Sequence, residues 1–197
     1  MRFRKSFVEV IGLIIFLILL WVIFLMTTDA RAQIYGIDYD LDTIAGKEVL
    51  DYIEDFHSGV SIRQSERAKS YAPYVVHWSD FYGLDPLLPS VVISAESGWK
   101  LNPKCTLKEK WRCGKGLMQV RGVAARGFDL SQPKYQVKAG IRWLRLSIDR
   151  CNGSIIRGLM AYQTKGRCKG KLIQGAKKRF RWYKNAIKRH RKTDIVS

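Results

Sequence analysis

An unbroken apolar run near the N-terminus stands apart from the periodic pattern in the rest of the chain. Between Val10 and Met26 the sequence VIGLIIFLILLWVIFLM carries no charged residue. At a rise of 1.5 Å per residue, a helix over this run spans about 25 Å, close to the hydrocarbon thickness of a bilayer. A buried core helix usually keeps a polar face, whereas this run is apolar all round. The pattern therefore predicts a transmembrane helix.

Three basic residues before the run predict its orientation. Arg2, Arg4 and Lys5 would stay in the cytoplasm by the positive-inside rule, which sends the following chain across the membrane. The chain is therefore predicted to cross the membrane once, with the domain that follows on the exported side. The alternative is a cleaved signal peptide, because Ala30-Arg31-Ala32 has the form of a cleavage site. The run exceeds the usual signal core of about 7–15 residues, which favours a retained anchor over residues 1–32.

The next segment, residues 33–65, is polar and locally acidic, and is interpreted as a stalk. Its carboxylates are Asp38, Asp40, Asp42, Glu48, Asp51, Glu54 and Asp55. Val49, Ile53 and Phe56 fall on one helix face, which predicts a short amphipathic helix within the stalk. Gly59 and Ser61 indicate a break after that helix.

Residues 66–190 are predicted to form a mainly α domain that ends in a basic helix, with 191–197 as a tail. A first apolar stripe runs through 68–82, and Pro73 indicates a helix start or a kink within it. A second helix is expected over 86–97, ended by Gly98. Later stripes follow Val137, Ile141, Leu144 and Ile148; Ile155, Leu159 and Tyr162; and Phe180, Tyr183 and Ile187. Few alternating patterns typical of strands occur, which agrees with a mainly α class. The exception is 104–116, which is expected to be a small hairpin or an irregular segment.

A net charge of +18 indicates an anionic partner or surface. Nucleic acid, anionic lipid and acidic cell-wall polymers all fit the charge. Phe180, Trp182 and Tyr183 interleave with the C-terminal basic residues, a composition also seen in nucleic-acid binders. The predicted exported location argues against nucleic acid. It favours anionic envelope polymers, outer-leaflet lipid, or a basic helix face that is simply solvated.

The four cysteines, Cys105, Cys113, Cys151 and Cys168, all follow the predicted anchor, on the side of the membrane where disulfides form. Of three possible connectivities, local pairing of Cys105 with Cys113 and of Cys151 with Cys168 is the most economical. A zinc site is disfavoured, because no CxxC pair occurs and the histidines are not grouped near the cysteines. Neither a metal nor a cofactor is expected.

Glu96, in the segment SVVISAESGW, is the candidate for acid–base chemistry. Val92 and Ile93 precede it by four and three residues, so it lies on an apolar helix face. Burial raises the pKa of a carboxyl, and a carboxyl protonated near neutral pH can donate to a glycosidic oxygen. Judged by periodicity alone, a structural glutamate paired with Lys100 or another base is the commoner case.

Three motifs, taken in order along the chain, favour the catalytic interpretation of Glu96 over the structural one. Ala95-Glu96-Ser97-Gly98-Trp99 is followed by Gly116-Leu117-Met118-Gln119-Val120 and then by Ala161-Tyr162-Gln163. Tyr82-Gly83-Leu84-Asp85-Pro86-Leu87-Leu88 leads into the first motif, and Gln132-Pro133, Gly140, Trp143 and Leu144 lie between the second and the third. Together these segments resemble the catalytic domain of the soluble lytic transglycosylase family, related to goose-type lysozyme. The resemblance covers residues 66 to 183 and implies a lysozyme-like helical fold.

The resemblance also implies roles for the matched positions. Glu96 would be the single acid/base, and Tyr162 would orient it or stabilise the transition state. Ser97, Met118, Gln119 and Gln163 would bind the sugar beside it. Without the resemblance, Met118 and Tyr162 are plain core residues, and Gln119 is a capping or turn group.

The reaction implied by the resemblance cuts the bond between N-acetylmuramic acid and N-acetylglucosamine and leaves a 1,6-anhydro product. The alternatives are hydrolysis of the same bond, as in goose-type lysozyme, or a non-catalytic glycan-binding component of an envelope-spanning complex. A membrane-anchored nucleic-acid binder is a further alternative, opposed by the topology. Wall remodelling, a secretion or conjugation apparatus, and an exported or virion-associated phage protein all fit such a domain.

Several positions depart from the family pattern. The link Cys105–Cys113 replaces a short serine-rich link, and Gln136 stands where asparagine is usual. The segment Ala161-Tyr162-Gln163-Thr164-Lys165-Gly166 replaces Ala-Tyr-Asn-Ala-Gly. These departures leave Glu96 in place and bear on the details of the groove and on substrate preference.

Overall fold

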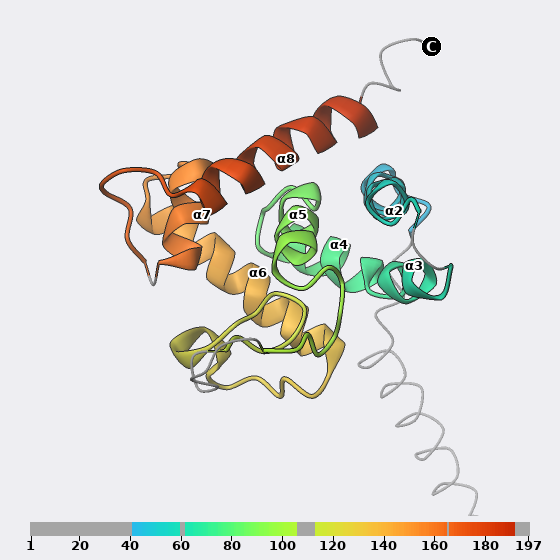
Figure 1. The fold of residues 1–197 in the computed structure, drawn as a ribbon, viewed down its shortest axis with the longest axis horizontal. Helices are drawn as coiled ribbons and strands as arrows, with labels where there is room; N and C mark the ends of the chain where they lie inside the picture. Colours follow the sequence, from blue (N-terminus) through green and yellow to red (C-terminus); the bar gives the residue numbers. More distant parts are fainter. Residues whose placement is uncertain (1–40, 60–61, 106–112, 165, 192–197) are drawn as a thin grey trace, which may run out of the picture. The chain divides into compact units, whose positions relative to one another are not determined.

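The computed structural model describes residues 41–59, 62–105, 113–164 and 166–191 (Figure 1). The chain divides into a unit of residues 1–38, which lies outside the described residues, and a unit of residues 39–197. The predicted transmembrane run and the cleavage motif therefore lie outside the described residues. Within the described ranges, no helix combines the length and the apolar character needed to cross a bilayer.

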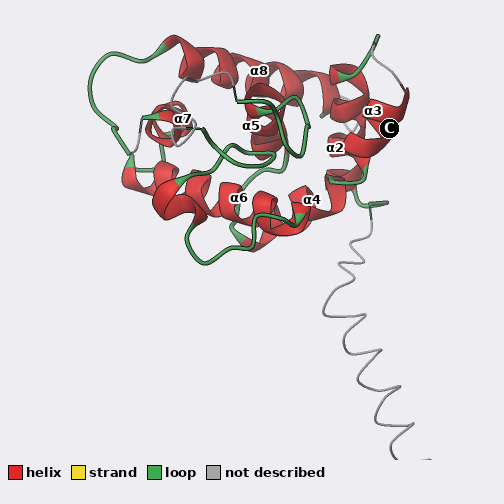
Figure 2. Cartoon of the chain, turned by 60° about the horizontal axis from the view of Figure 1, so that its bottom comes forward, coloured by secondary structure: helices red, strands yellow, loops and turns green. Residues whose placement is uncertain are grey.

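The described part of the second unit is mainly helical, as the apolar stripes predict (Figure 2). Its elements are α2 (Ile44–Phe56), α3 (Ile62–Lys69), α4 (Ala72–Phe81), α5 (Leu87–Glu96), the 3-10 helix η2 (Gly122–Ala125), α6 (Pro133–Arg150), α7 (Ile155–Gln163) and α8 (Gln174–His190). In the described ranges, extended pairing is limited to an isolated bridge between Lys115 and Val120. The bridge lies at the end of the segment expected to be a hairpin or irregular, and residues 106–112 of that segment are outside the described residues.

Helix α5 lies at the centre of the fold, with α8 along one side and α6 along the other (Figures 1 and 2). Every residue from Leu87 to Ser94 is buried. Two serines in this apolar helix are satisfied internally, because Ser90 donates to the carbonyl of Pro86 and Ser94 donates to that of Ser90. The helix ends at Glu96, and Gly98 follows with a φ of 57°, a left-handed conformation that suits glycine at a helix end.

The stripe through 68–82 is divided between two helices. Helix α3 ends at Lys69, and α4 begins at Ala72 with Pro73 in its first turn. Proline lacks the N–H that a helix interior needs but fits the first turn, where that N–H has no intrahelical partner. Of the two expectations for Pro73, a helix start is the one observed.

The acidic segment holds more packed structure than its interpretation as a stalk implies. Its predicted amphipathic helix is α2, and Val49 and Ile53 are fully buried against the core formed with α4 and α5. The compact unit therefore begins before α2, ahead of residue 66, where the domain was expected to start. Apolar periodicity indicates a buried face but does not say which domain buries it.

Carboxylates of α2 and of the α4–α5 turn pair with the end of the basic last helix. Arg191 donates through Nε to both oxygens of Glu48 at 3.2 Å and through Nη2 to Asp85 at 2.7 Å. Tyr183 donates to the second oxygen of Asp85 at 2.5 Å. Glu48 is buried, so its pairing with Arg191 offsets the cost of burying its charge. This network ties α2 and the α4–α5 turn to the C-terminal end of α8.

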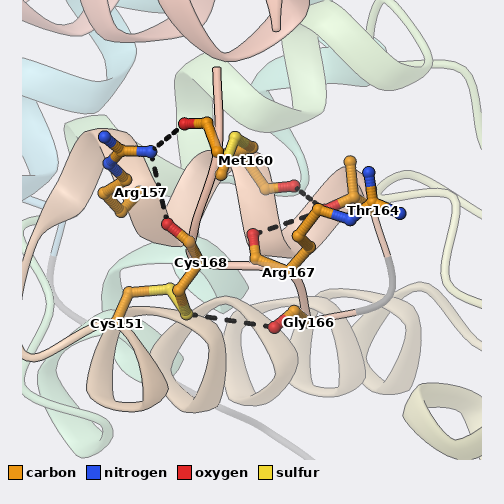
Figure 3. Close-up of a disulfide and its surroundings, with 8 residues drawn as sticks. Cys151, Arg157, Met160, Thr164, Gly166, Arg167 and Cys168 are labelled. Atoms are coloured by element: carbon orange, nitrogen blue, oxygen red, sulfur yellow. Dashed lines mark hydrogen bonds between the residues drawn. A yellow bond between two sulfur atoms is a disulfide. The ribbon is translucent and has the colours of Figure 1, made fainter. Parts of the chain in front are cut away.

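Both predicted disulfides are confirmed: Cys105 bonds to Cys113, and Cys151 bonds to Cys168. The second joins the end of α6 to the loop between α7 and α8 (Figure 3). Arg157 on α7 donates to the carbonyls of Cys168 and Gly170 in the same loop. The loop that leads into α8 is thus held from both preceding helices.

Replacing Cys151 and Cys168 together by serine is expected to lower the free energy of unfolding by about 3 kcal/mol, because the bridge closes a loop of the unfolded chain. Urea denaturation under oxidising conditions measures the difference. A reductant should destabilise this variant less than the wild type, which loses two bridges under reduction. Equal stability of the two proteins would contradict the loop-closure argument.

Candidate functional site

A cavity of about 470 Å³ lies at the C-terminal end of α5. Segments that are distant in sequence supply its wall: the end of α5, the segment 103–105, the turn at 114–121, η2, α6, the end of α7 and the first half of α8. The lining residues are Glu96, Pro103, Lys104, Cys105, Cys113, Gly114, Gln119, Val120, Arg121, Ala124, Trp143, Tyr162, Gln163 and Arg179. Of these described residues, Glu96 alone carries a carboxyl side chain.

The carboxyl of Glu96 is placed in the wall because it is the last residue of a buried helix. Val92 and Ile93 on the same helix are fully buried, and 18% of the Glu96 side chain is exposed. Burial raises the pKa of Glu96 above its ordinary value, while the charges of Arg179 and Arg121 act in the opposite direction. The carbonyl end of α5 also disfavours an anion there. The net effect is a raised pKa for Glu96.

Arg179 of α8 holds that carboxyl in place. Its Nη2 donates to Oε1 of Glu96 at 2.9 Å, and its Nη1 donates to the carbonyl of Gly175 at 3.1 Å. The amide of Gln163, oriented with its oxygen toward the guanidinium, accepts from Nε at 3.0 Å and also from Nη1. One planar guanidinium thus joins the last residues of α5 and α7 to the first turns of α8.

The turn carrying Gly116-Leu117-Met118-Gln119 is fixed by side-chain amides. Gln136 of α6 accepts from the N–H of Leu117 at 2.9 Å and donates to the carbonyl of Leu130 at 2.8 Å. Gln119 has a φ of 50°, unusual for a residue with a side chain, and its amide donates to the carbonyl of Gly116 at 2.8 Å. Such a conformation costs free energy and is found mainly where the surroundings hold it, often at functional sites.

Tyr162 reaches the same turn from α7. Its hydroxyl donates to the carbonyl of Met118 at 2.6 Å. Burial, and then the charge of Glu96, raise the pKa of Tyr162 well above its ordinary value, so it remains a neutral phenol. Its position in the cavity wall lets it contact a bound molecule next to Glu96.

Four of the predicted site residues meet at the cavity, and two do not. Glu96, Gln119, Tyr162 and Gln163 line it together. Ser97 is buried at the end of α5, where its hydroxyl donates to the carbonyl of Ile93 at 3.1 Å.

Met118 is also fully buried, and it packs directly against Gly140 of α6, where an added Cβ would come within 2.3 Å of its sulfur. In this structure Ser97 and Met118 support the cavity from behind and do not form its surface.

Among the lining residues without a predicted role, those that carry a charge or an aromatic ring are Lys104, Arg121, Trp143 and Arg179. Trp143 belonged to the family resemblance but received no role. Arg179 was one of many basic residues in the C-terminal part, and 83 positions separate it from Glu96. No local pattern distinguishes it from Lys178 or Arg181, since only the packing of α8 on α5 selects it.

In the described ranges, no group of three or more His, Cys, Asp or Glu side chains is arranged to hold a metal ion. All four cysteines are in disulfides. Comparison with known proteins found no matching family model, no matching curated protein and no matching solved structure.

Replacing Gln136 by leucine is expected to lower the free energy of unfolding by about 2–4 kcal/mol, because the N–H of Leu117 and the carbonyl of Leu130 lose their partner in a buried setting. Gln132→Leu is the matched control: its side chain is exposed, so a change within about 0.5 kcal/mol is expected. Denaturation curves of the two variants provide the comparison. Similar losses for both would show that Gln136 does not organise the turn.

Proposed function

We propose that this chain is a peptidoglycan lytic transglycosylase with a lysozyme-like domain, cleaving the β-1,4 bond between N-acetylmuramic acid and N-acetylglucosamine. The observation that carries the proposal is Glu96, a mostly buried carboxyl with a raised pKa in the wall of a cavity. Breaking a glycosidic bond requires a proton donor at the leaving oxygen, and a carboxyl whose pKa is raised by burial is suited to that role. The ordered motifs around Glu96, Gln119 and Tyr162 support the same reaction class.

The proposed reaction uses one carboxyl twice. Glu96 gives its proton to the glycosidic oxygen as the bond from that oxygen to the anomeric carbon of the muramoyl residue breaks. The 6-hydroxyl of the same muramoyl residue then attacks the anomeric carbon, and its proton returns to Glu96. The products are a 1,6-anhydromuramoyl end and a free 4-hydroxyl, so no water is consumed and Glu96 is regenerated.

The lining of the cavity favours this route over a two-carboxylate mechanism. Glycosidases that invert or form a glycosyl–enzyme intermediate need a second carboxyl about 5–9.5 Å from the first. Among the described residues of the cavity wall, the other charged groups are cations: Lys104, Arg121 and Arg179. Tyr162, neutral and next to Glu96, is suited to a hydrogen bond with the sugar.

The cations of the wall fit a substrate with negative charge, and peptidoglycan carries carboxylates on its muramoyl peptides. Hydrolysis of the same bond, as in goose-type lysozyme, is the closest competing reaction. A glycan-binding role within an envelope-spanning complex is another, but binding alone does not require a mostly buried carboxyl with a raised pKa in the cavity. The proposed partners are therefore glycan strands, with the basic face of α8 available to other anionic envelope polymers.

Glu96→Gln is expected to reduce glycan cleavage by at least about 10²-fold, because it keeps the shape of the side chain and removes the transferable proton. Release of soluble fragments from purified peptidoglycan measures the loss. Glu66→Gln, an exposed glutamate of α3, is the matched control and should cleave as the wild type does. Unimpaired cleavage by folded Glu96→Gln would remove Glu96 from the mechanism.

The product distinguishes the two closest reactions. Mass spectrometry of the released muropeptides is expected to find 1,6-anhydro ends, each lighter by one water than a reducing end. Reducing ends alone would leave Glu96 as the acid but assign the chain to the hydrolytic class.

We also propose that residues 1–32 anchor the domain in the inner membrane and place it in the periplasm. An alkaline phosphatase fusion after Gln33 is expected to be active, because the enzyme folds only after export. Charge reversal of Arg2, Arg4 and Lys5 in the same fusion should reduce activity if these residues orient the anchor. An inactive, cytoplasmic fusion of the unmodified segment would contradict the proposed location.

A further inference from the structure

The guanidinium of Arg179 is held more rigidly than a surface salt bridge requires. Besides Glu96, it has the carbonyl of Gly175 and the amide oxygen of Gln163 as partners. Only 13% of the Arg179 side chain is exposed. A buried guanidinium with three partners has little freedom to move away, so its charge and its direction of donation are both fixed relative to Glu96.

Gly175 allows this arrangement on α8. A Cβ at this position would lie 2.5 Å from the Gln163 amide and 2.9 Å from Nη1 of Arg179. Any larger residue would displace one of the two groups. The bare backbone one turn before Arg179 therefore makes room for the amide and the guanidinium together.

The loop that precedes the first turn of α8 is also held in place. The Cys151–Cys168 disulfide and the hydrogen bonds from Arg157 fix the loop just before α8 (Figure 3). The position of Arg179 thus follows from several independent constraints.

Two opposing effects act on the proton of Glu96. Burial favours the neutral acid, whereas Arg179, bonded directly to Oε1, favours the carboxylate. The other charged or titratable groups around the cavity are Arg121 before η2, Lys104 after α5 and Tyr162 of α7. Arg121 acts in the same direction as Arg179. Arg179 donates a hydrogen bond directly to the carboxyl.

A residue that acts first as acid and then as base needs both forms to be accessible. Burial alone would leave Glu96 a weak acid that holds its proton. Pairing with a fixed cation lowers the cost of the carboxylate that exists between the two proton transfers. It also holds Oε1 in one direction, so that the other oxygen is the one free to face the substrate.

We propose that Arg179 is a positioning residue for Glu96, which it orients and whose carboxylate it stabilises between the two halves of the reaction. The proposal rests on the proposed function for its catalytic consequence. The electrostatic part concerns the folded protein alone and is measurable without substrate.

The electrostatic part is tested by titrating Glu96 in the intact protein. Carbon NMR of the labelled glutamate carboxyls, with Glu96→Gln to assign the signal, gives the pKa in wild type and in Arg179→Gln. Removing the cation is expected to move the pKa of Glu96 upward. Arg181→Gln is the matched control, since Arg181 is exposed, lies on the same helix and is outside the cavity wall. An unchanged or lower pKa in Arg179→Gln overturns the proposal.

The catalytic part is tested by the pH dependence of cleavage. Activity that needs protonated Glu96 falls as pH rises through its pKa, so the alkaline limb of kcat/KM is expected to move to higher pH in Arg179→Gln. A fall in kcat of about 10- to 100-fold is expected as well, because the carboxyl loses its fixed direction. Arg179→Lys keeps the positive charge but loses the planar guanidinium. The alkaline limb of kcat/KM in this variant should therefore stay at the wild-type pH, while kcat remains low.

A lower kcat without movement of the limb would indicate a merely structural role and overturn the proposal. If wild type cleaves no glycan, the proposed function fails while the NMR titration still decides the role of Arg179. Should Arg179→Gln not fold, Gln163→Leu removes one anchor of the guanidinium and is expected to move the pKa of Glu96 in the same upward direction. No movement in that folded variant also contradicts the proposal.

Discussion

From Leu87 to Ser94 every residue of α5 is buried, and the helix meets the cavity only through Glu96 at its end. This burial dictates much of the surrounding structure. Helices α2, α4, α6 and α8 each cover part of α5. Ser94 accepts from the hydroxyl of Tyr52 at 3.1 Å and from the indole of Trp99 at 2.8 Å. A central apolar helix thus fixes where its one acidic residue emerges.

The charges of the chain are organised around the same centre. A net charge of +18 would repel itself in a compact unit, and the acidic residues of α2 lie where they offset part of this repulsion. Glu48 pairs with Arg191, and Asp55 lies 3.7 Å from Arg189 and 3.5 Å from His190. The outer face of α8 keeps its exposed lysines and arginines, whereas Arg179 on the inner face turns its charge to Glu96. One basic helix therefore supplies both a solvated surface and a buried cation.

The cavity shows how backbone strain and buried polar groups are combined at one place. Gln119 adopts a left-handed conformation, and its turn is held by Gln136 from α6 and by Tyr162 from α7. Gln136 accepts from one backbone group and donates to another, so neither is left unpaired. The supporting residues Ser97 and Met118 contribute from behind the surface.

The sequence alone indicated most of the helices and favoured the local pairing of the cysteines, because apolar periodicity, glycine and proline positions, and short Cys separations are local signals. It also indicated Glu96, whose apolar neighbours Val92 and Ile93 lie on the same helix face. Only the tertiary structure decided that α2 packs in the domain core and that Gln163 and Arg179 meet at Glu96. It also decided that Met118 faces Gly140. These outcomes depend on how helices pack across long sequence separations. The residues that neighbour Arg179 in the sequence do not indicate which of the many arginines will contact Glu96.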